Sequence, residues 1–545
     1  MRFFILLFMV VMVSCQPATT YDLILRNGTI YDGSGQDAYF GDVAIQGDTI
    51  AAIAEKIDAI GTREIDISGM AVAPGFINML SWANVALLHD GRSQSDIRQG
   101  VTLEVMGEGR SMGPLNEAMK QEMLDNQVDI KFDIAWTTLG EYLQHLEDRG
   151  VSTNVASFVG NGTLRQHVIG YDNRPATVLE TEKMQELAIQ AMEEGAVGIS
   201  SALLYAPSSY ASTEELTALA SVVGEYGGMY ISHIRNEGDQ LLESIDELIT
   251  IGKNGNLPAE VYHLKASGQH NWYKMDLAIA KIDSARNAGL DIMADIYTYN
   301  ASSTGLHVQL PDWAREGGID RMLERLKDPA VRKKTIEELD FRNPPETIML
   351  VGFKNPDLRK YSGKYLPEVA RELGKSPAEA TVDLMLEDDS RIQVVYFSMS
   401  EENISKKVAV PWVSFCSDAG SMSSEGVFIR QSTHPRAYGS FIRVLGKFAR
   451  DEGVISLEEG VRKLTSLPAE NLKLKKRGRL KPGYFADVVV FDPLKTHDQA
   501  TFQQPHQYAE GMLHVFVNGV QVLQDGDHTG ATPGRFVKGP GYSGM

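Results

Sequence analysis

The chain has 545 residues, 43% of them hydrophobic, and a formal net charge of -20 at pH 7. A chain of this length can bury the core of one large domain and still supply a smaller companion domain. The acidic balance argues against a nucleic-acid partner, because phosphate binding needs a basic protein face.

The first residues have the pattern of an export signal. An apolar run over residues 3–13 is too short to span a bilayer but has the length of a secretory signal core. The run ends at Cys15, in a sequence similar to the lipobox of bacterial lipoproteins. We therefore expect residues 1–20 to direct export, and Cys15 to attach a periplasmic or cell-surface lipoprotein to a membrane through a lipid anchor alone. A plain secretory signal with an incidental cysteine is the alternative.

Both ends of the chain favour short β-strands. Near the start, apolar runs are separated by turn signals such as Asn27-Gly28, and similar runs return near the end. Each end has too few strands to be stable alone. We therefore expect residues 21–72 and 478–540 to build one small β-sandwich domain together. Two unrelated caps are the alternative.

The middle of the chain, residues 73–477, alternates apolar runs with helical patterns. Residues 155–159 predict a strand, residues 182–194 a helix, and residues 229–233 another strand. Continuous apolar strands followed by helices indicate a parallel sheet, and the length of this part is typical of an α/β fold of the (β/α)8 TIM barrel type. Residues 306–365 interrupt the rhythm with charged helical sequence, and we expect an inserted subdomain there, near the active-site mouth.

Two histidines end neighbouring strands of the predicted barrel. His233 follows the apolar residues 229–232, and His263 follows residues 259–262 after an intervening helix. Because the carboxyl ends of barrel strands meet at one mouth, the two imidazoles are expected close enough to share a metal ion. A single histidine at such a place is more often a hydrogen-bonded structural residue, but two in successive units favour a metal.

A carboxylate supplies the third predicted ligand. Strand alternation over residues 100–108 puts Glu104 and Glu108 on one side, with Glu108 at the level of the histidines and Glu104 deeper. Two histidines and one carboxylate, with an open position for water, form a common catalytic zinc site. We predict that Glu108 completes this set. An ion pair between Glu108 and Arg110 is the alternative.

Asp418 is the predicted proton carrier. It follows the apolar strand over residues 412–417, late in the predicted barrel, and therefore faces the same mouth as the histidines. An aspartate there can take a proton from metal-bound water and return it to a leaving amine. The alternative is a helix N-cap.

Short motifs in a specific order run through the whole chain. They are Gln99-Gly100-Val101-Thr102, Gly162-Thr163-Leu164-Arg165, Gly195-Ala196-Val197-Gly198, His233-Ile234-Arg235-Asn236-Glu237, His263-Leu264-Lys265, Ala294-Asp295-Ile296-Tyr297, Ser417-Asp418 and His434-Pro435-Arg436. Each motif is weak alone, but their order and spacing are specific. From about residue 21 to about residue 518, the chain resembles the N-acyl-D-amino-acid deacylases, or D-aminoacylases, of the amidohydrolase superfamily.

The resemblance implies roles for further residues. Zinc in this family is held by two histidines, which fall on His233 and His263. A second-strand cysteine, the other ligand, falls near Gly109, which has no side chain, and Glu108 is the nearest replacement. The family's catalytic aspartate falls on Asp418. The residues that fall on the binders of the substrate carboxylate are Lys265, Tyr297, Arg436 and Ser303, with Ser302 as the alternative serine.

The departures from the family pattern concern the first barrel strand. Family members carry a His-x-His pair there that holds a second, weaker metal, and this chain has Leu80 and Trp82 in the two positions. A Gly-His-Gly-Thr motif of relatives also has Asn161 in place of its histidine. Because the tightly held metal uses His233 and His263, we expect one Zn²⁺ per chain and retained catalysis. Trp82 is expected to fill much of the space of the second metal.

The function expected from these observations is zinc-dependent hydrolysis of the amide bond in a small N-acyl amino acid. One alternative is a dipeptidase or cyclic-amide hydrolase on the same barrel, acting on a small dipeptide or ring. Another is a lipoprotein that has lost catalysis and only binds ligands. The retention of Asp418 opposite two imidazoles argues against a pure binding protein.

Overall fold

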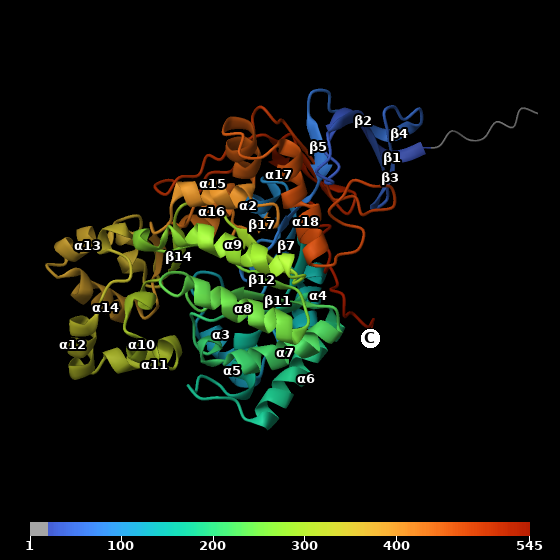
Figure 1. Ribbon diagram of the computed structural model, residues 1–545. Coiled ribbons are helices and arrows are strands. Elements are labelled where there is room, and N and C mark those ends of the chain that lie inside the picture. The colour runs from blue at the N-terminus through green and yellow to red at the C-terminus, as the bar shows by residue number, and fades with distance from the viewer. Residues whose placement is uncertain (1–19, 545) are drawn as a thin grey trace, which may run out of the picture.

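The computed structural model describes residues 20–544 of the chain (Figure 1). The predicted lipidation site Cys15 and the rest of residues 1–19 lie outside the described residues. Helices and strands alternate through the middle of the chain, so the α/β class is as predicted. Within residues 20–544, none of the helices combines the length and the hydrophobicity that a membrane span requires.

Parallel strands form the centre of the molecule. One sheet has the order β17, β13, β12, β11, β10, β9, and a second sheet has the order β6, β7, β8. Most of their residues are buried, which explains the continuous apolar runs of the sequence. The bounds are β6 Phe76–Asn78, β7 Val101–Met106, β8 Asn154–Ser157, β9 Val159–Gly160, β10 Gly198–Ala202, β11 Met229–His233, β12 Ala259–Val261, β13 Ile292–Ile296 and β17 Val413–Phe415.

The two parallel sheets meet at both of their edges, β8 with β9 and β6 with β17. On one side, only Phe158 separates β8 of the smaller sheet from β9 of the larger one. On the other side, the backbone N–H of Met79 donates to the carbonyl of Phe415 at 3.3 Å, and that of Asp418 donates to the carbonyl of Leu80 at 2.9 Å. The chain just after β6 therefore lies beside the end of β17.

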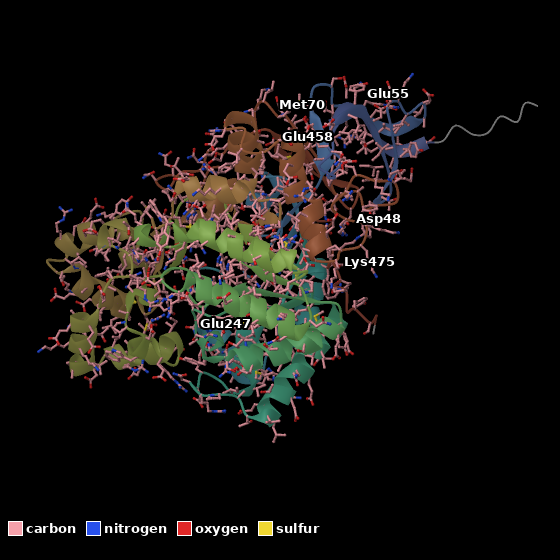
Figure 2. The ribbon with its side chains drawn as sticks, viewed as in Figure 1. Asp48, Glu55, Met70, Glu247, Glu458 and Lys475 are labelled. Carbon is pink, nitrogen blue, oxygen red and sulfur yellow. The ribbon has the colours of Figure 1, made fainter. Side chains whose placement is uncertain are left out.

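Helices cover the outside of these strands (Figure 1). At the start of α6, Thr177 and Glu180 form a reciprocal capping box. Figure 2 shows Glu247 on α8, where it pairs with Arg235 at 2.8 Å. The helix bounds are α4 Leu139–Arg149, α5 Asn161–Val168, α6 Val178–Glu194, α7 Thr213–Glu225, α8 Leu241–Gly255, α9 Lys274–Asn287, α15 Glu401–Ala409, α17 Leu457–Leu464 and α18 Ser466–Asn471, with α1 Ala86–His89, α2 Gln94–Ile97, α3 Glu117–Asp125 and α16 Arg436–Gly439 in the connections.

Strands from both chain ends share one further sheet, at the upper right of Figure 1. The pairing is continuous through β1, whose first part pairs with β4 and whose last residues pair with β5. The folding of these strands into two layers of a sandwich stays a prediction. The turn predicted at Asn27-Gly28 is a bulge inside β1, with Asn27 in the left-handed region at φ 61°. The bounds are β1 Thr20–Ile30, β2 Tyr39–Gln46, β3 Thr49–Ala54, β4 Ile60–Asp66, β5 Ala71–Pro74, β18 Val488–Phe491, β19 Met512–Val517, β20 Val520–Gln524 and β21 Asp527–His528.

A helical segment protrudes at the left of Figure 1 and has its own hydrophobic core. That core reaches from Leu306 to Tyr396, beyond the predicted limit at residue 365, because β16 pairs with both β14 and β15. Partly buried Tyr205 packs against the same core. The bounds are β14 Ser302–Gly305, β15 Ile348–Gly352, β16 Gln393–Tyr396, α10 Asp312–Arg315, α11 Gly318–Leu326, α12 Pro329–Glu338, α13 Leu366–Glu372 and α14 Pro377–Asp388.

Candidate metal centre

Glu108, His233 and His263 converge at the carboxyl ends of three parallel strands. His233 is the last residue of β11, while Glu108 and His263 each follow their strands, β7 and β12, by two residues. Oε1 of Glu108 lies 3.0 Å from Nδ1 of His233 and 2.9 Å from Nε2 of His263. The three side chains are buried, and their donor atoms all lie within 4.8 Å of one another.

The donor set of this cluster fits a divalent metal ion. Zinc bonds of about 2.0–2.1 Å in a tetrahedral site place neighbouring donor atoms roughly 3.3 Å apart. The observed separations of 2.9 and 3.0 Å are therefore only a few tenths of an ångström too short. Two imidazole nitrogens and one carboxylate oxygen are also the ligand types that zinc takes in catalytic sites.

Glu237 and Lys265 lie behind the histidines. Nδ1 of His263 is 3.1 Å from Oε1 of Glu237 and 2.6 Å from Nζ of Lys265, and these two partners are themselves 2.5 Å apart. A carboxylate behind a metal-binding imidazole orients the ring and fixes its tautomer. The sequence patterns did not predict this role for Glu237, although it ends the motif that begins at His233.

The charges around His263 favour a cation at this position. Burial and the neighbouring Lys265 lower the pKa of His263, but three surrounding carboxylates outweigh them and raise it to about 10. Burial would raise the pKa of Glu108, but the charges of His263 and His233 hold it below its usual range. The cluster therefore stabilises positive charge beside an ionised carboxylate, and a bound metal ion would supply that charge with both imidazoles neutral.

Asp418 is brought to the same mouth. Its Oδ2 lies 2.7 Å from Nη1 of Arg436, and its Oδ1 accepts a hydrogen bond of 3.2 Å from the indole Nε1 of Trp82. The same Nε1 donates to Oε2 of Glu108 at 3.1 Å. The expected proton carrier and the expected metal ligand are thus connected through one N–H group.

Two of these residues have strained backbones. His263 has a φ of 36° and Asp418 a φ of 48°, in the left-handed region that residues with side chains rarely adopt. Backbone hydrogen bonds hold both: the N–H of His263 donates to Asp295 at 2.7 Å, and that of Asp418 to the carbonyl of Leu80 at 2.9 Å. Such outliers cluster at functional sites, where the surroundings enforce them.

The four residues expected to bind the substrate carboxylate have different surroundings. The ring of Tyr297 lies under the guanidinium of Arg436, 4.6 Å away, and Nε of that arginine is buried without a hydrogen-bond partner among the described residues. Lys265 instead pairs with Glu237. The hydroxyl of Ser303 donates to the carbonyl of Val394 at 2.8 Å, and only the carbonyl of Ser303 contacts Arg436, at 3.4 Å. Arg436 thus lies between Asp418 and the ring of Tyr297, and Lys265 lies against His263.

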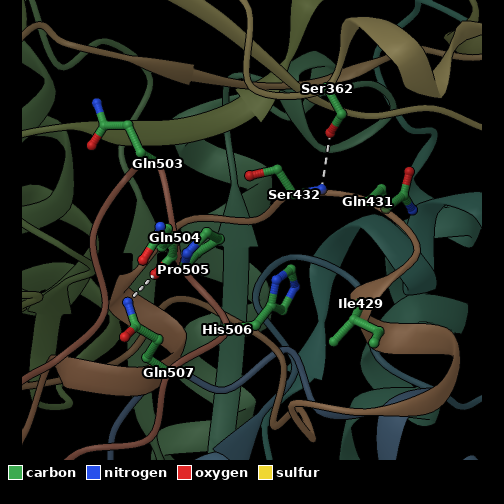
Figure 3. Close-up of a pocket in the computed structure, with 9 residues that line it drawn as sticks. All are labelled: Ser362, Ile429, Gln431, Ser432, Gln503, Gln504, Pro505, His506 and Gln507. Carbon is green, nitrogen blue, oxygen red and sulfur yellow. Dashed lines mark hydrogen bonds between the residues drawn. The ribbon is translucent and has the colours of Figure 1, made fainter.

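A separate cleft of about 420 Å³ lies between the protruding segment and two loops. Figure 3 shows that its walls carry amide, hydroxyl and imidazole side chains. It is lined by Ser362, Ile429, Gln431, Ser432, Gln503, Gln504, Pro505, His506 and Gln507. None of these residues belongs to the metal cluster, so this cleft is separate from the converging ionisable groups.

Known proteins resemble the chain along nearly its whole length. A family model described as "Amidohydrolase family" matches residues 430–523. A D-aminoacylase of Alcaligenes xylosoxydans xylosoxydans is 34% identical, over 96% of this chain and 99% of the relative. Two solved structures each have a TM-score of 0.80 and cover 95% of this chain and 100% of theirs. One, 32% identical, is a D-aminoacylase with a binuclear metal centre, described by one-metal activation and second-metal attenuation. The other, 29% identical, is an N-acyl-D-glutamate deacylase from Bordetella bronchiseptica with zinc and a phosphonate inhibitor.

Proposed function

Because the chain belongs to the D-aminoacylase family of the amidohydrolases, we propose that it hydrolyses the amide bond of N-acyl amino acids with one zinc ion. As a member of this family, the protein is a hydrolase that acts on carbon–nitrogen bonds. The observation that carries the proposal is the convergence of Glu108, His233 and His263 on one point. A family relative binds zinc, which supports zinc as the metal.

We infer that the parallel strands close into a (β/α)8 barrel, residues 73–477, beside a β-rich domain of residues 21–72 and 478–540. The backbone hydrogen bonds from Met79 to Phe415 and from Asp418 to Leu80 join the edges of the two sheets and support this closure. The relatives with TM-scores of 0.80 support it too. Catalytic groups of such barrels lie at the carboxyl ends of the strands, where the metal cluster is found.

Glu108, His233 and His263 would hold the metal, and when bound it supplies a Lewis acid that activates water and polarises the scissile carbonyl. Asp418 takes the proton from the attacking water and passes it to the departing nitrogen. Its Oδ2 is held by Arg436 and its Oδ1 by Trp82, so its orientation is set before substrate arrives. The products are a carboxylic acid and a free amino acid.

Arg436 and Tyr297 are proposed to bind the carboxylate of the substrate. Nε of Arg436 is buried and free of hydrogen bonds among the described residues, so a carboxylate satisfies it. The ammonium of Lys265 pairs with Glu237 behind the metal ligands, and its expected role in binding the substrate carboxylate stays a prediction. Ser303 contributes its backbone carbonyl, which accepts from Arg436 at 3.4 Å.

One metal per chain is proposed instead of two. Leu80 is completely buried and offers no donor atom, and the indole of Trp82 has a proton on its nitrogen and no lone pair to give. The relative for which one metal activates and a second attenuates supports catalysis by a single ion. Export and lipid attachment at Cys15 remain proposals from the sequence, and Cys15→Ser is expected to release the protein from membranes.

The experiment that tests the function combines metal analysis with a substrate panel. Purified protein is expected to hold about one zinc per chain and to hydrolyse members of parallel panels of N-acyl-D- and N-acyl-L-amino acids. His263→Ala should lose both the metal and the activity, because only two of the three protein ligands remain. His497→Ala, which changes an exposed histidine outside the cluster, is the matched control and should keep both. A metal-free wild-type protein that is inert on the whole panel would overturn the proposal.

A further inference from the structure

We propose that Trp82 is a positioning residue of the reaction. Its indole N–H lies between the carboxylates of Glu108 and Asp418, at 3.1 and 3.2 Å, and holds both in the orientation that the reaction needs. The inference rests on the proposed function, and it gives an active role to a residue that otherwise only replaces a lost metal ligand.

The hydrogen bond from Trp82 gives the two carboxylate oxygens of Glu108 different partners. Oε1 faces the two imidazole nitrogens, at 3.0 and 2.9 Å. Oε2 is turned away from them and accepts from Trp82. A carboxylate with one anchored oxygen presents the other to a metal in a single direction, and such outer partners tune affinity and activity.

The hydrogen bond to Asp418 does the same for the proton carrier. Its Oδ2 is paired with Arg436 at 2.7 Å, so Trp82 is the described partner that orients Oδ1. Without the indole N–H, Asp418 can turn about its side-chain bonds while still paired with the arginine. Misplacement of a proton carrier by a fraction of an ångström lowers the rate of the chemical step much more than substrate affinity.

Electrostatics explains why a donor is needed at this place. Oxygens of two carboxylates, Glu108 and Asp418, approach a single nitrogen atom, and like charges at such separations repel each other. An N–H group between them offers partial positive charge to both. The indole nitrogen only donates and cannot bind a metal, so Trp82 supplies this positive charge without adding a second ion.

The register of the backbone fixes Trp82 in this position. Its N–H donates to the carbonyl of Ala419 at 2.9 Å, and Ser81 forms a parallel bridge with the same alanine. The indole therefore lies directly beside Asp418. The side chain is 42% exposed, so it reaches the mouth of the site and is not a core residue held there by packing.

The test removes the indole N–H and keeps an aromatic ring. Trp82→Phe is expected to lower kcat about 10- to 100-fold while KM changes less than about twofold, and to raise the zinc dissociation constant about tenfold. The matched control is Trp313→Phe. Trp313 also donates its indole N–H to a carboxylate, that of Glu338 at 2.8 Å, but on the protruding segment. The control should keep wild-type kcat and zinc affinity.

A second substitution protects the test against misfolding. Replacing Trp82 with 3-benzothienylalanine keeps the shape of the indole and removes only the N–H, so it should reproduce the losses of Trp82→Phe. Circular dichroism checks the fold of each variant. If the protein with the isosteric side chain keeps wild-type kcat and zinc affinity, Trp82 is not a positioning residue.

The outcomes separate this inference from the proposed function. If the wild type binds zinc and hydrolyses N-acyl amino acids but both Trp82 variants behave like it, only the role of Trp82 is wrong. If the wild type neither binds zinc nor hydrolyses any substrate of the panel, the proposed function fails and the role of Trp82 fails with it.

Discussion

Two glutamates of one strand region, Glu104 in β7 and Glu108 just after it, have opposite surroundings. Both are buried. Glu104 lies deeper and accepts hydrogen bonds from the hydroxyls of Ser81, at 2.6 Å, and Thr153, at 2.9 Å. Glu108 lies at the mouth, against two imidazole nitrogens and an indole N–H.

The difference shows that the neighbours of a buried carboxyl decide what it can do. Burial raises the pKa of Glu104, and the hydroxyls of Ser81 and Thr153 only partly oppose that rise. At Glu108, the charges of the histidines outweigh burial and lower the pKa. A carboxyl that retains its proton is a poor metal ligand, whereas an ionised one among imidazoles is a good one.

The largest expected effect belongs to Glu108→Gln. The neutral amide removes the negative charge that faces the metal, so zinc affinity should fall by at least about 10- to 100-fold and kcat should fall with it. Zinc content after dialysis and turnover of an N-acyl amino acid measure both. Glu104→Gln is the matched control and should keep its zinc. If instead Glu104→Gln emptied the site and Glu108→Gln did not, the assignment of the third ligand would be wrong.

A smaller effect is expected on stability in Glu104→Gln. A carboxyl whose pKa is raised by folding contributes to the stability of the folded protein. The contribution is complete below the pKa of the unfolded chain, near 4.5, and is lost as the pH rises through the pKa of the folded protein. Glutamine cannot ionise. From pH 4.5 to 7 the variant should therefore gain stability relative to the wild type, by at most about 1.4 kcal/mol per pH unit.

Thermal unfolding of both proteins across this pH range measures the difference. The slope should be reduced and not abolished, because the pKa of neighbouring Asp96 is also raised, by burial and by the charge of Glu104. Equal pH dependence in variant and wild type would show that Glu104 is not protonated preferentially in the folded protein.

The smallest effect is expected for Thr153→Val, which has nearly the shape of threonine. It removes one hydroxyl donor from Glu104 and should lower the free energy of unfolding by about 1 kcal/mol. Zinc content and kcat should stay at the wild-type level, because the cluster at Glu108 is untouched. A loss of zinc from this variant would mean that the deep and the outer carboxyl act as one unit.

Much of the site could be predicted from strand ends and alternation. His233 and His263 follow successive apolar strands, and Glu108 follows a third, so the rule that strand ends meet at one mouth placed all three together. Glu237 could not be found this way, because it lies in a loop and its partners His263 and Lys265 follow a different strand.

Sequence patterns predicted the fold about as far as they predicted the site. Apolar periodicity indicated the α/β class and most strands of the centre. The end of the protruding segment was placed too early, at residue 365, because β16 joins it through pairing with β14 and β15, and pairing between distant strands leaves no local signal. The bulge at Asn27 was taken for a turn for a related reason, since left-handed residues occur in both.

The sequence by itself determined which ligand types remain and which are gone: two histidines and a glutamate at strand ends, and Leu80 and Trp82 where a His-x-His pair would stand. Only the tertiary structure decided what Trp82 does. The indole N–H meets Glu108 and Asp418 because the ends of three strands come together in space. Hydrogen bonds depend on distances of a few tenths of an ångström, which residue order alone does not contain.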